Sequence, residues 1–505
     1  MNLTDLLLGP SSASSDAVAL ETPRGRWTYG RLAGVTARAA AALASAGLEP
    51  GARVAVVGPG DERFVVAYLA VLHAGGVAVP LNPEAPPPEL ARQLVVVEPA
   101  LLVGPDAPGV LEATRAAGGP DGARPVVLAD DPDVEPAPRV ERDDGDLAAL
   151  LFSAGTAGPP RAAMLTHGCL AANVRQVLDH PGLRVRPDDV CLAALPLFHV
   201  YGLNVVLGVG LAAGATVVLV PEFEPGAVLE LVRRHGVTVL AGVPPMYRSW
   251  LDLSARDAPA DAFAGVRLAV SGAAPLPVAT AEAMRERFGL VVHEGYGLTE
   301  ASPIVTTTAV AGRAPAGSIG PPLPGVEVRL VDVDGADVLI GDPGEVWVRG
   351  PNVFAGYWRD PEATASVLTA DGWLRTGDVA VVDDDGFLRL VDRAKDLVIV
   401  SGFNVYPAEV EGVLREHPDV ADAAVVGTPS ERTGETVVAA VVPVPGRTVD
   451  PATLAAWSGE RLARYKVPTV IEVVDELPRT IAGKVLRREL RAAHVHGPDR
   501  RDPGR

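Results

Sequence analysis

The chain has 505 residues, 48% of them hydrophobic, and a formal net charge of −19 at pH 7. This length and composition predict roughly two to four globular domains with large cores. The acidic balance excludes nucleic acid and anionic membrane surfaces as main partners, because both select for clustered basic residues. Cys169 and Cys191 lack the spacing of a metal site or a disulfide scaffold, and the N-terminus lacks a signal peptide, so we expect a cytoplasmic location.

Short Val-rich runs alternate with helical patterns over roughly the first 300 residues. This alternation predicts parallel sheets covered by helices on both faces. Residues 104–145, rich in Pro, Asp and Gly, are typical of surface loops. Residues 190–220 are uncharged if His199 is neutral and are long enough to span a bilayer, yet they contain Pro196 and four glycines. We interpret them as strand, buried helix and strand, with a membrane span as the alternative.

The pattern changes after about residue 315. Short strands with Asp-Gly turns predict a small antiparallel sheet or barrel. From residue 395 a helix, two strands and a second helix over 452–465 predict a compact α+β unit. The residues from about 491 onward are expected to form a frayed tail.

Two common nucleotide-binding motifs are missing. "VVGPGDERF" follows a predicted strand, but Arg63 occupies the place of the third glycine of the dinucleotide fingerprint. A Walker A sequence occurs nowhere in the chain. The stretch "LLFSAGTAGPPRAAMLTH" (150–167) could close backbone amides around phosphate oxygens, with the Thr156 hydroxyl and the Arg161 charge beside them. An ordinary turn remains the alternative for that stretch.

Further motifs follow in a characteristic order. "EGYGLTEASP" (294–303) places an aromatic ring, a hydroxyl and a carboxylate within five residues, at Tyr296, Thr299 and Glu300. "TGD" (376–378), "DRAKD" (392–396), "SGFNVYPAEVE" (401–411) and "PRTIAGKVLRREL" (478–490) come next. Lysine occurs only at 395, 466 and 484, although the chain has 44 basic residues. Because the chain uses Arg at nearly all its other basic positions, the lysine in "AGK" indicates that this position specifically requires a lysine side chain.

In these five motifs the chain resembles the ANL superfamily of adenylate-forming enzymes, and in particular its acyl-CoA synthetases. The resemblance implies an α/β fold with an N-terminal domain of two doubly wound parallel-sheet lobes plus a small β-barrel. A small, mobile α+β C-terminal domain follows. We place the N-terminal AMP-binding domain at residues 1–393 and the C-terminal domain, which carries the catalytic lysine, at 394–505.

The resemblance also implies a two-step reaction. A carboxylate attacks the α-phosphate of ATP, with Mg²⁺ bound, to give acyl-AMP and pyrophosphate, and the thiol of CoA then displaces AMP. Tyr296 would stack on adenine, with a wall of small residues opposite it. Thr299 would donate to phosphate, and Glu300 would be the Mg²⁺ ligand. The nucleotide site is expected to include Gly272, Ala273, Ala274, Pro275, Glu294, Gly295, Tyr296, Gly297, Asp378 and Arg393, the last two at the ribose.

The C-terminal motifs carry further implied roles. Lys395 corresponds to the hinge, with a solvated surface charge as the alternative. Gly402 and Phe403 resemble the loop that lines the pantetheine tunnel. Lys466 is either near the CoA phosphates or a surface lysine. Lys484 would lie between the incoming carboxylate and the α-phosphate, where a compact ammonium fits better than a planar guanidinium.

The phosphate loop departs from the family pattern. Gly155, Thr156 and Gly158 are retained, but Ala154 and Ala157 stand where hydroxyl residues are usual, and Arg161 and Ala162 where Lys and Gly are usual. The loss of donors to charged phosphates reduces the expected rate or ATP affinity, typically by about 1.5–3 kcal/mol for each donor. A catalytically weak nucleotide-binding relative is therefore one alternative.

The acid itself is left open. "PLFHVYGLN" (196–204) resembles the segment with the family's aromatic gate, so His199 would close the acyl pocket. The apolar segments around it favour a medium- or long-chain fatty acid. An aromatic acid of the 4-coumarate type, with Tyr201 as a phenol partner, is the first alternative, and a malonate-type acid, with Arg248 as the only nearby cation, is the second. The acceptor could also be an acyl carrier protein, and the enzyme a monomer or homodimer.

Overall fold

The computed structural model describes residues 1–9, 14–152, 160–310, 314–332, 334–393, 396, 398–400, 403–430, 433–462, 464–480, 483 and 485–495. They form two compact units. Unit 1 contains the described residues of 1–155, 159–328 and 347–375, and unit 2 those of 329–346 and 376–505. Among the described helices, none is long and apolar enough to cross a membrane.

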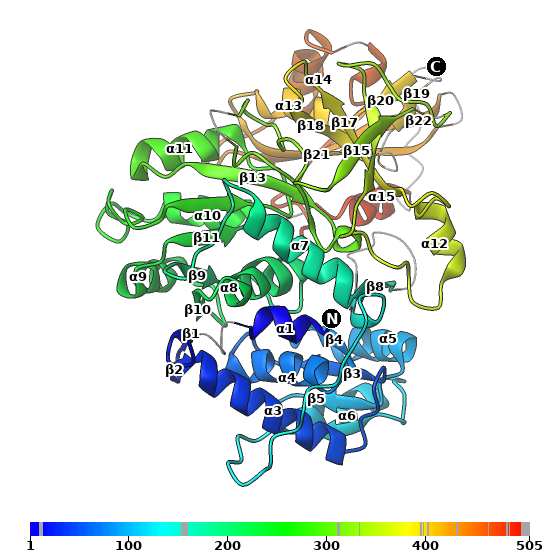
Figure 1. Ribbon diagram of the computed structural model, residues 1–505. Coiled ribbons are helices and arrows are strands. Elements are labelled where there is room, and N and C mark those ends of the chain that lie inside the picture. Colours follow the sequence, from blue (N-terminus) through cyan, green and yellow to red (C-terminus); the bar gives the residue numbers. More distant parts are fainter. Residues whose placement is uncertain are drawn as a thin grey trace. The chain divides into compact units, whose positions relative to one another are not determined.

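The larger sheet of unit 1 has eight strands. Its interior strands are parallel, as the alternating pattern predicted, whereas the edge strands β14 and β2 are antiparallel to their neighbours. The N-terminal hairpin joins this sheet beside β10 (Figure 1). The order across the sheet is β14 (Ile304–Thr307), β13 (Val292–Gly297), β12 (Leu268–Ser271), β11 (Val239–Gly242), β9 (Val190–Ala193), β10 (Thr216–Leu219), β1 (Val18–Thr22) and β2 (Gly25–Thr28).

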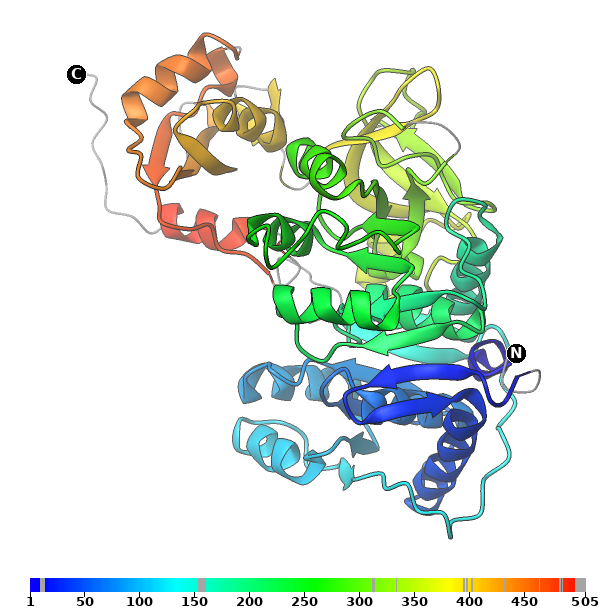
Figure 2. The same cartoon turned by 90° about the vertical axis from the view of Figure 1, so that its left-hand side faces the viewer.

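The second sheet of unit 1 has six strands, most of which lie in the blue and cyan lobe of Figures 1 and 2. The dark-blue hairpin β1–β2 beside it belongs to the eight-stranded sheet. Its strands are parallel except for β8, which runs antiparallel to β7. The order is β6 (Arg124–Val126), β5 (Leu101–Val103), β3 (Arg53–Val57), β4 (Val77–Leu81), β7 (Leu147–Phe152) and β8 (Ala162–Thr166). Residues 104–145 are not all loop, because residues 107–116 form a helix whose Leu111 is buried against this sheet.

Three helices of unit 1 begin at residues that commonly cap helix N-termini. Thr28, Asp61 and Thr166 cap the first turns of α3, α4 and α7 with their side-chain oxygens. The helices are α1 (Leu3–Leu7), α3 (Tyr29–Ser45), α4 (Glu62–His73), α5 (Pro87–Val97), α6 (Ala107–Ala116), α7 (His167–Asp179), α8 (Val209–Ala212), α9 (Pro225–His235), α10 (Pro244–Asp252), α11 (Val278–Phe288) and α12 (Pro361–Val367), with a 3₁₀ turn η2 (Thr299–Ala301).

The uncharged segment 190–220 is a strand, a helix and a strand, as predicted. Its helix begins as a π-helix, η1 (Tyr201–Gly208), before it becomes the α-helical α8. A π-helix is rare and often marks a functional site. The amino-acid pattern gave no sign of this change in helical pitch.

Unit 2 contains two sheets. The sheet predicted after residue 315 has the order β15 (Glu327–Val331), β16 (Gly344–Arg349), β17 (Leu374–Val382) and β18 (Leu388–Arg393), and β17 and β18 pair antiparallel. The second sheet has the order β20 (Phe403–Val405), β19 (Val398–Val400), β22 (Gly434–Pro443) and β21 (Val420–Ser430), with β23 (Val470–Val473) parallel to β22. Its helices are α13 (Pro407–Arg415), α14 (Pro451–Gly459), the 3₁₀ turn η4 (Arg464–Lys466) and α15 (Arg487–Val495).

Two predicted boundaries in unit 2 were wrong. The helix predicted over 452–465 ends at Gly459, a residue that lowers helix stability, and the chain then turns to bury Leu462. The residues from 491 do not fray at once, because α15 continues to Val495. Leu490 is buried against β21 and β22, and Arg491 forms an ion pair with Asp396, so tertiary contacts extend this helix.

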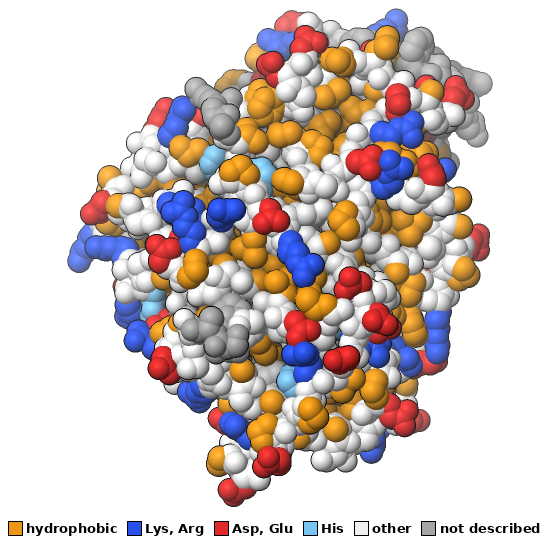
Figure 3. Space-filling model, viewed as in Figure 1, with side chains coloured by type: hydrophobic (Ala, Val, Ile, Leu, Met, Phe, Trp, Pro, Cys, Tyr) orange, Lys and Arg blue, Asp and Glu red, His pale blue; other side chains and the backbone are white. Residues whose placement is uncertain are grey.

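Charged side chains are spread over the surface. On the face in Figure 3 acidic and basic groups are interspersed, with no broad basic area. This face therefore offers no broad basic surface to a large anionic partner.

Candidate active site

The small-residue segment 272–275 leaves the carboxyl end of β12 and leads toward α11. Ala273 has a φ of +66°, a left-handed conformation that is uncommon for residues other than glycine. A Cβ atom on Gly272 would lie 3.0 Å from the ring of Tyr201. The segment predicted to face adenine is therefore a tight bend at the carboxyl edge of a parallel sheet, where ligands of doubly wound folds bind.

Glu294 forms a hydrogen bond with the residue that follows this bend. Strand β13 runs parallel to β12, with Glu294 opposite Ser271. The Oε2 atom of Glu294 accepts a hydrogen bond from the backbone N–H of Leu276 at 3.1 Å. Burial raises the pKa of the Glu294 carboxyl to about 7, and the hydrogen bond from Leu276 partly opposes this shift.

The "YGLTE" segment follows on β13 and η2. The side chain of Tyr296 is buried. A Cβ atom on Gly297 would lie 2.0 Å from the carbonyl oxygen of Pro303, so only glycine lets the chain fold back here. Thr299 and Glu300 start the 3₁₀ turn directly after β13. The structure thus brings these three predicted site residues into one short, sharply folded segment.

Three buried asparagines that we did not predict hold the segment after Glu300. Asn352 donates to the carbonyl oxygen of Ala301 at 2.8 Å, and Asn204 donates to that of Ser302 at 2.8 Å. Asn173 bonds both the N–H and the carbonyl of Ile304, at 3.1 and 2.9 Å. Asn204 stands out in the uncharged segment 190–220, and a buried amide there signals a specific backbone partner.

Glu300 accepts hydrogen bonds at its backbone carbonyl and at its side-chain carboxylate. Its carbonyl oxygen accepts from the N–H of Phe354 at 2.9 Å. Its Oε1 atom accepts from the hydroxyl of Tyr357 at 2.7 Å. Arg161, predicted to face phosphate, forms an ion pair with Asp360 at 3.3 Å. Its guanidinium lies 5.8 Å from the centre of the Tyr357 ring.

The predicted acyl gate lies where the chain enters the π-helix. The Nδ1 atom of His199 accepts from the N–H of Tyr201 at 3.3 Å. Burial lowers the pKa of His199, so this imidazole is neutral at pH 7. Gly202 permits the close approach, because a Cβ atom there would lie 2.4 Å from the carbonyl oxygen of Pro196.

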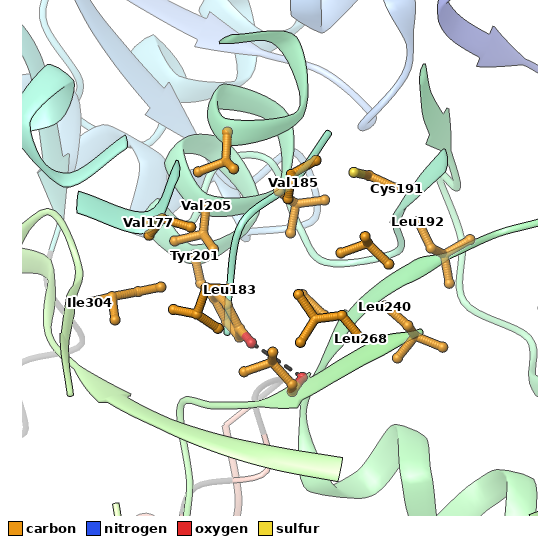
Figure 4. A pocket seen from close by; sticks show the side chains of 15 residues that line it. Val177, Leu183, Val185, Cys191, Leu192, Tyr201, Val205, Leu240, Leu268 and Ile304 are labelled. Carbon is orange, nitrogen blue, oxygen red and sulfur yellow. Dashed lines mark hydrogen bonds between the residues drawn. The ribbon is translucent and has the colours of Figure 1, made fainter. Parts of the chain in front are cut away.

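Tyr201 lines an apolar cavity of about 40 Å³ (Figure 4). The Tyr201 hydroxyl donates to the carbonyl oxygen of Val270 at 3.4 Å. The cavity is lined by Val177, Leu183, Val185, Cys191, Leu192, Tyr201, Val205, Val206, Val209, Val239, Leu240, Ala241, Leu268, Val270 and Ile304. No charged side chain is among the described residues that line it.

Unit 2 holds the predicted ribose residues. Asp378 on β17 lies opposite Arg393 on β18, so the two motifs meet across one antiparallel pair. The Asp378 side chain is buried. Gly377 has a φ of +70°, and its N–H donates to Glu345 at 3.0 Å, while the Thr376 hydroxyl donates to the carbonyl of Val346 at 2.7 Å.

Several predicted residues lie outside the described residues, namely Gly155, Thr156, Gly158, Lys395, Gly402 and Lys484. Phe403 is the first residue of β20. The chain on both sides of Lys484 is described: Arg479 and Val485 form an antiparallel bridge, and Gly483 has a φ of +81°. The positive φ of Gly483 is a conformation that favours glycine at this position.

An ion-pair network in unit 2 links the chain after the predicted hinge to helix α15. Asp396 is buried and pairs with Arg491 at 2.9 Å and with Arg487 at 3.7 Å. Arg487 also reaches the buried Glu411 at 2.6 Å. Lys466, by contrast, pairs with Glu409 at 2.6 Å.

Comparisons with known proteins show the family of the chain. The family model for the AMP-binding enzyme matches residues 11–358, and that for the AMP-binding enzyme C-terminal domain matches residues 409–484. A feruloyl-CoA synthase from Amycolatopsis sp is 42% identical over 467 residues, which cover 92% of this chain and 93% of the relative. A long-chain-fatty-acid–CoA ligase from Yersinia pestis is 42% identical over 356 residues, covering 69% of this chain and 62% of the relative.

Among solved structures, ATP-bound MatB from Rhodopseudomonas palustris superimposes with a TM-score of 0.89 at 35% identity, covering 98% of this chain and 99% of that one. The fold and the motifs therefore define an adenylate-forming enzyme. The chain belongs to the AMP-binding enzyme family and is an acyl-CoA synthetase of the ANL superfamily. ATP and CoA are substrates of the CoA ligases in this family.

Proposed function

We propose that the enzyme activates an aromatic acid of the hydroxycinnamate type and transfers it to CoA. The observation that carries this substrate is the position of Tyr201, whose buried ring lies against Gly272 and lines the apolar cavity. In this proposal the ring forms the end of the acyl pocket, and such a pocket suits a short, flat acid better than a long chain. The similarity to a feruloyl-CoA synthase supports the same choice.

The proposed reaction has two steps. The carboxylate attacks the α-phosphorus of ATP and pyrophosphate leaves; the CoA thiolate then attacks the acyl carbon and AMP leaves. In the first step Tyr296 stacks on adenine against residues 272–275, Asp378 and Arg393 hold the ribose, and Thr299 donates to phosphate. The Lys484 ammonium neutralises the charge between carboxylate and α-phosphate. Gly155, Thr156, Gly158 and Arg161 complete the phosphate site.

Glu300 is the proposed ligand of Mg²⁺. Among the described residues, no group of three or more His, Cys, Asp and Glu side chains could hold a metal. A single half-buried carboxylate nevertheless fits Mg²⁺, which usually keeps its waters and binds one or two carboxylates plus substrate phosphates. When bound, the ion withdraws charge from the phosphate oxygens.

We further propose that a hinge at Lys395 separates domains 1–393 and 394–505, and that Gly402 and Phe403 line the route of the CoA arm. The two half-reactions need different surroundings, which a change at a few backbone dihedrals can supply. A cytoplasmic location remains part of this proposal, supported by two buried free cysteines.

A medium- or long-chain fatty acid, the substrate that we favoured from the sequence, is the second candidate. The specific observation for it is the apolar cavity, which would accept a chain if Tyr201 turned aside. A malonate-type acid is disfavoured, because the Arg248 side chain is 68% exposed and paired with Asp252 rather than buried at the pocket.

The test is acid-dependent ATP–pyrophosphate exchange, followed by detection of the CoA thioester by mass spectrometry. Ferulate, 4-coumarate, octanoate, palmitate and malonate are compared at equal concentration. We expect the two aromatic acids to give the highest kcat/KM. Faster exchange with palmitate would replace the aromatic proposal by the fatty-acid one. No exchange with any acid, despite measurable ATP binding, would identify the catalytically silent relative.

A further inference from the structure

The segment 354–358 in unit 1 pairs with strand β8, which follows the predicted phosphate loop. Tyr357 forms an antiparallel bridge with Ala163 of β8. Three backbone hydrogen bonds of 2.8–2.9 Å also join residues 355–358 to residues 162–164. Strand β8 begins directly after Arg161, so the backbone of Tyr357 is attached to the chain that leaves the phosphate loop.

The same segment forms hydrogen bonds with both the backbone and the side chain of Glu300. The N–H of Phe354 donates to the carbonyl oxygen of Glu300 at 2.9 Å, and the hydroxyl of Tyr357 donates to Oε1 at 2.7 Å. A hydrogen bond to a carboxylate is stronger than one between neutral groups. With its carbonyl and Oε1 both held, the carboxylate of Glu300 has little rotational freedom.

The Tyr357 ring is itself held in place. It is 9% exposed and packs edge-on against Phe354, with ring centres 5.0 Å apart. The backbone N–H of Tyr357 donates to the hydroxyl of Thr364 at 2.9 Å. The phenol is the donor in the hydrogen bond with Glu300, because an ionised carboxylate has only acceptor oxygens.

We propose that Tyr357 is a positioning residue that couples the phosphate-loop strand to Glu300 and presents the second oxygen of that carboxylate to Mg²⁺ on ATP. This inference rests on the proposed function, because it takes Glu300 to be the metal ligand. Orientation of a ligating carboxylate by a hydrogen bond to its other oxygen is a general way to raise metal affinity, and the loss of such a partner typically lowers affinity about 10- to 100-fold.

The test compares Tyr357→Phe with a matched control, Tyr29→Phe. Both changes remove one buried hydroxyl that donates hydrogen bonds, but Tyr29 donates to the carbonyl oxygens of Leu211 and Ala215, in a part of unit 1 without predicted site residues. Isothermal titration calorimetry measures ATP affinity with and without Mg²⁺ in the full-length chain. The Mg²⁺ dependence of ATP–pyrophosphate exchange and thioester formation from supplied acyl-AMP and CoA are measured on the same samples.

For Tyr357→Phe we expect affinity for ATP with Mg²⁺ to fall about tenfold and the Mg²⁺ requirement of exchange to rise by a similar factor. Affinity for ATP without Mg²⁺ and thioester formation from acyl-AMP should stay at the wild-type level, as should every readout of Tyr29→Phe. Equal losses with and without Mg²⁺, or the same loss in both variants, would overturn the inference and leave a structural role. If wild-type binding of ATP does not depend on Mg²⁺, Glu300 does not have its proposed role as the Mg²⁺ ligand. The inference about Tyr357, which rests on that role, is then wrong as well.

Discussion

The side-chain amide of Asn204, in the π-helix, donates a hydrogen bond of 2.8 Å to the carbonyl oxygen of Ser302, two residues after Glu300. The same amide also donates to the carbonyl oxygen of Leu170 on α7 at 3.2 Å. Through Asn204, the π-helix is thus hydrogen-bonded both to the segment that carries Glu300 and to helix α7. A regular α-helix would present a different set of side chains to this segment.

Asn204→Asp should therefore be strongly destabilising. The change keeps the shape but replaces the donor by a carboxylate oxygen that faces two carbonyl oxygens. We expect a loss of about 2–4 kcal/mol in the free energy of unfolding, measured by urea denaturation. Asn82→Asp is the matched control, because Asn82 accepts a hydrogen bond from the N–H of Glu84 at an exposed turn, which an aspartate can also do. Equal stability of the two variants would contradict this role of Asn204.

Glu294→Gln should alter how stability depends on pH. The folded-state pKa of Glu294, about 7, lies above its ordinary value of 4.5, so the folded chain holds this proton more tightly. Its contribution to stability is complete below about pH 4.5 and is lost as the pH rises toward 7. Glutamine still accepts from Leu276 and carries no charge. We expect the variant to be more stable at pH 8, by up to about 3 kcal/mol, and to lose this advantage at pH 4.

The same denaturation series can also contradict this prediction for Glu294. A difference between Glu294→Gln and the wild type that does not change with pH would mean that Glu294 is not a buried group of raised pKa. A destabilised variant at pH 8 would mean that the charge itself is required there.

Asp396→Ala should loosen helix α15. The change removes the Asp396 partner of Arg491, whereas Arg487 keeps the buried Glu411, and loss of a charged hydrogen-bond partner typically costs about 1.5–3 kcal/mol. Hydrogen exchange measured by mass spectrometry should show faster exchange in residues 487–495, and Asp384→Ala, in an exposed turn, should show none. Unchanged exchange in α15 would show that its other contacts hold it.

Tyr201→Ala should shift the acid preference toward longer, flexible chains. Removal of the ring would enlarge the cavity of about 40 Å³ that Tyr201 lines. We expect kcat/KM for octanoate to rise and kcat/KM for ferulate to fall, each about tenfold, whereas Tyr201→Phe keeps the ring and should stay close to wild type. A uniform loss for all acids would show that Tyr201 supports the fold rather than the selection of acids.

The sequence predicted the fold class because it depends on short-range patterns: alternating hydrophobicity indicated the parallel strands. The sharp fold of the "YGLTE" segment was not predicted. Partners distant in sequence were not predictable: Tyr357 meets Glu300 across 57 residues, and Asn173 meets Ile304 across 131. Such pairs are set by tertiary packing, which leaves no local period in one sequence.

Lys484 carries the central claim, and the two half-reactions test it separately. Lys484→Arg and Lys484→Ala are compared with wild type in ferulate-dependent ATP–pyrophosphate exchange and in CoA thioester formation from supplied feruloyl-AMP. If a compact ammonium must lie between carboxylate and α-phosphate, both variants should lose exchange by about a hundredfold or more and keep thioester formation. Equal loss of the two half-reactions would contradict the account, because Lys484 would then be a structural residue.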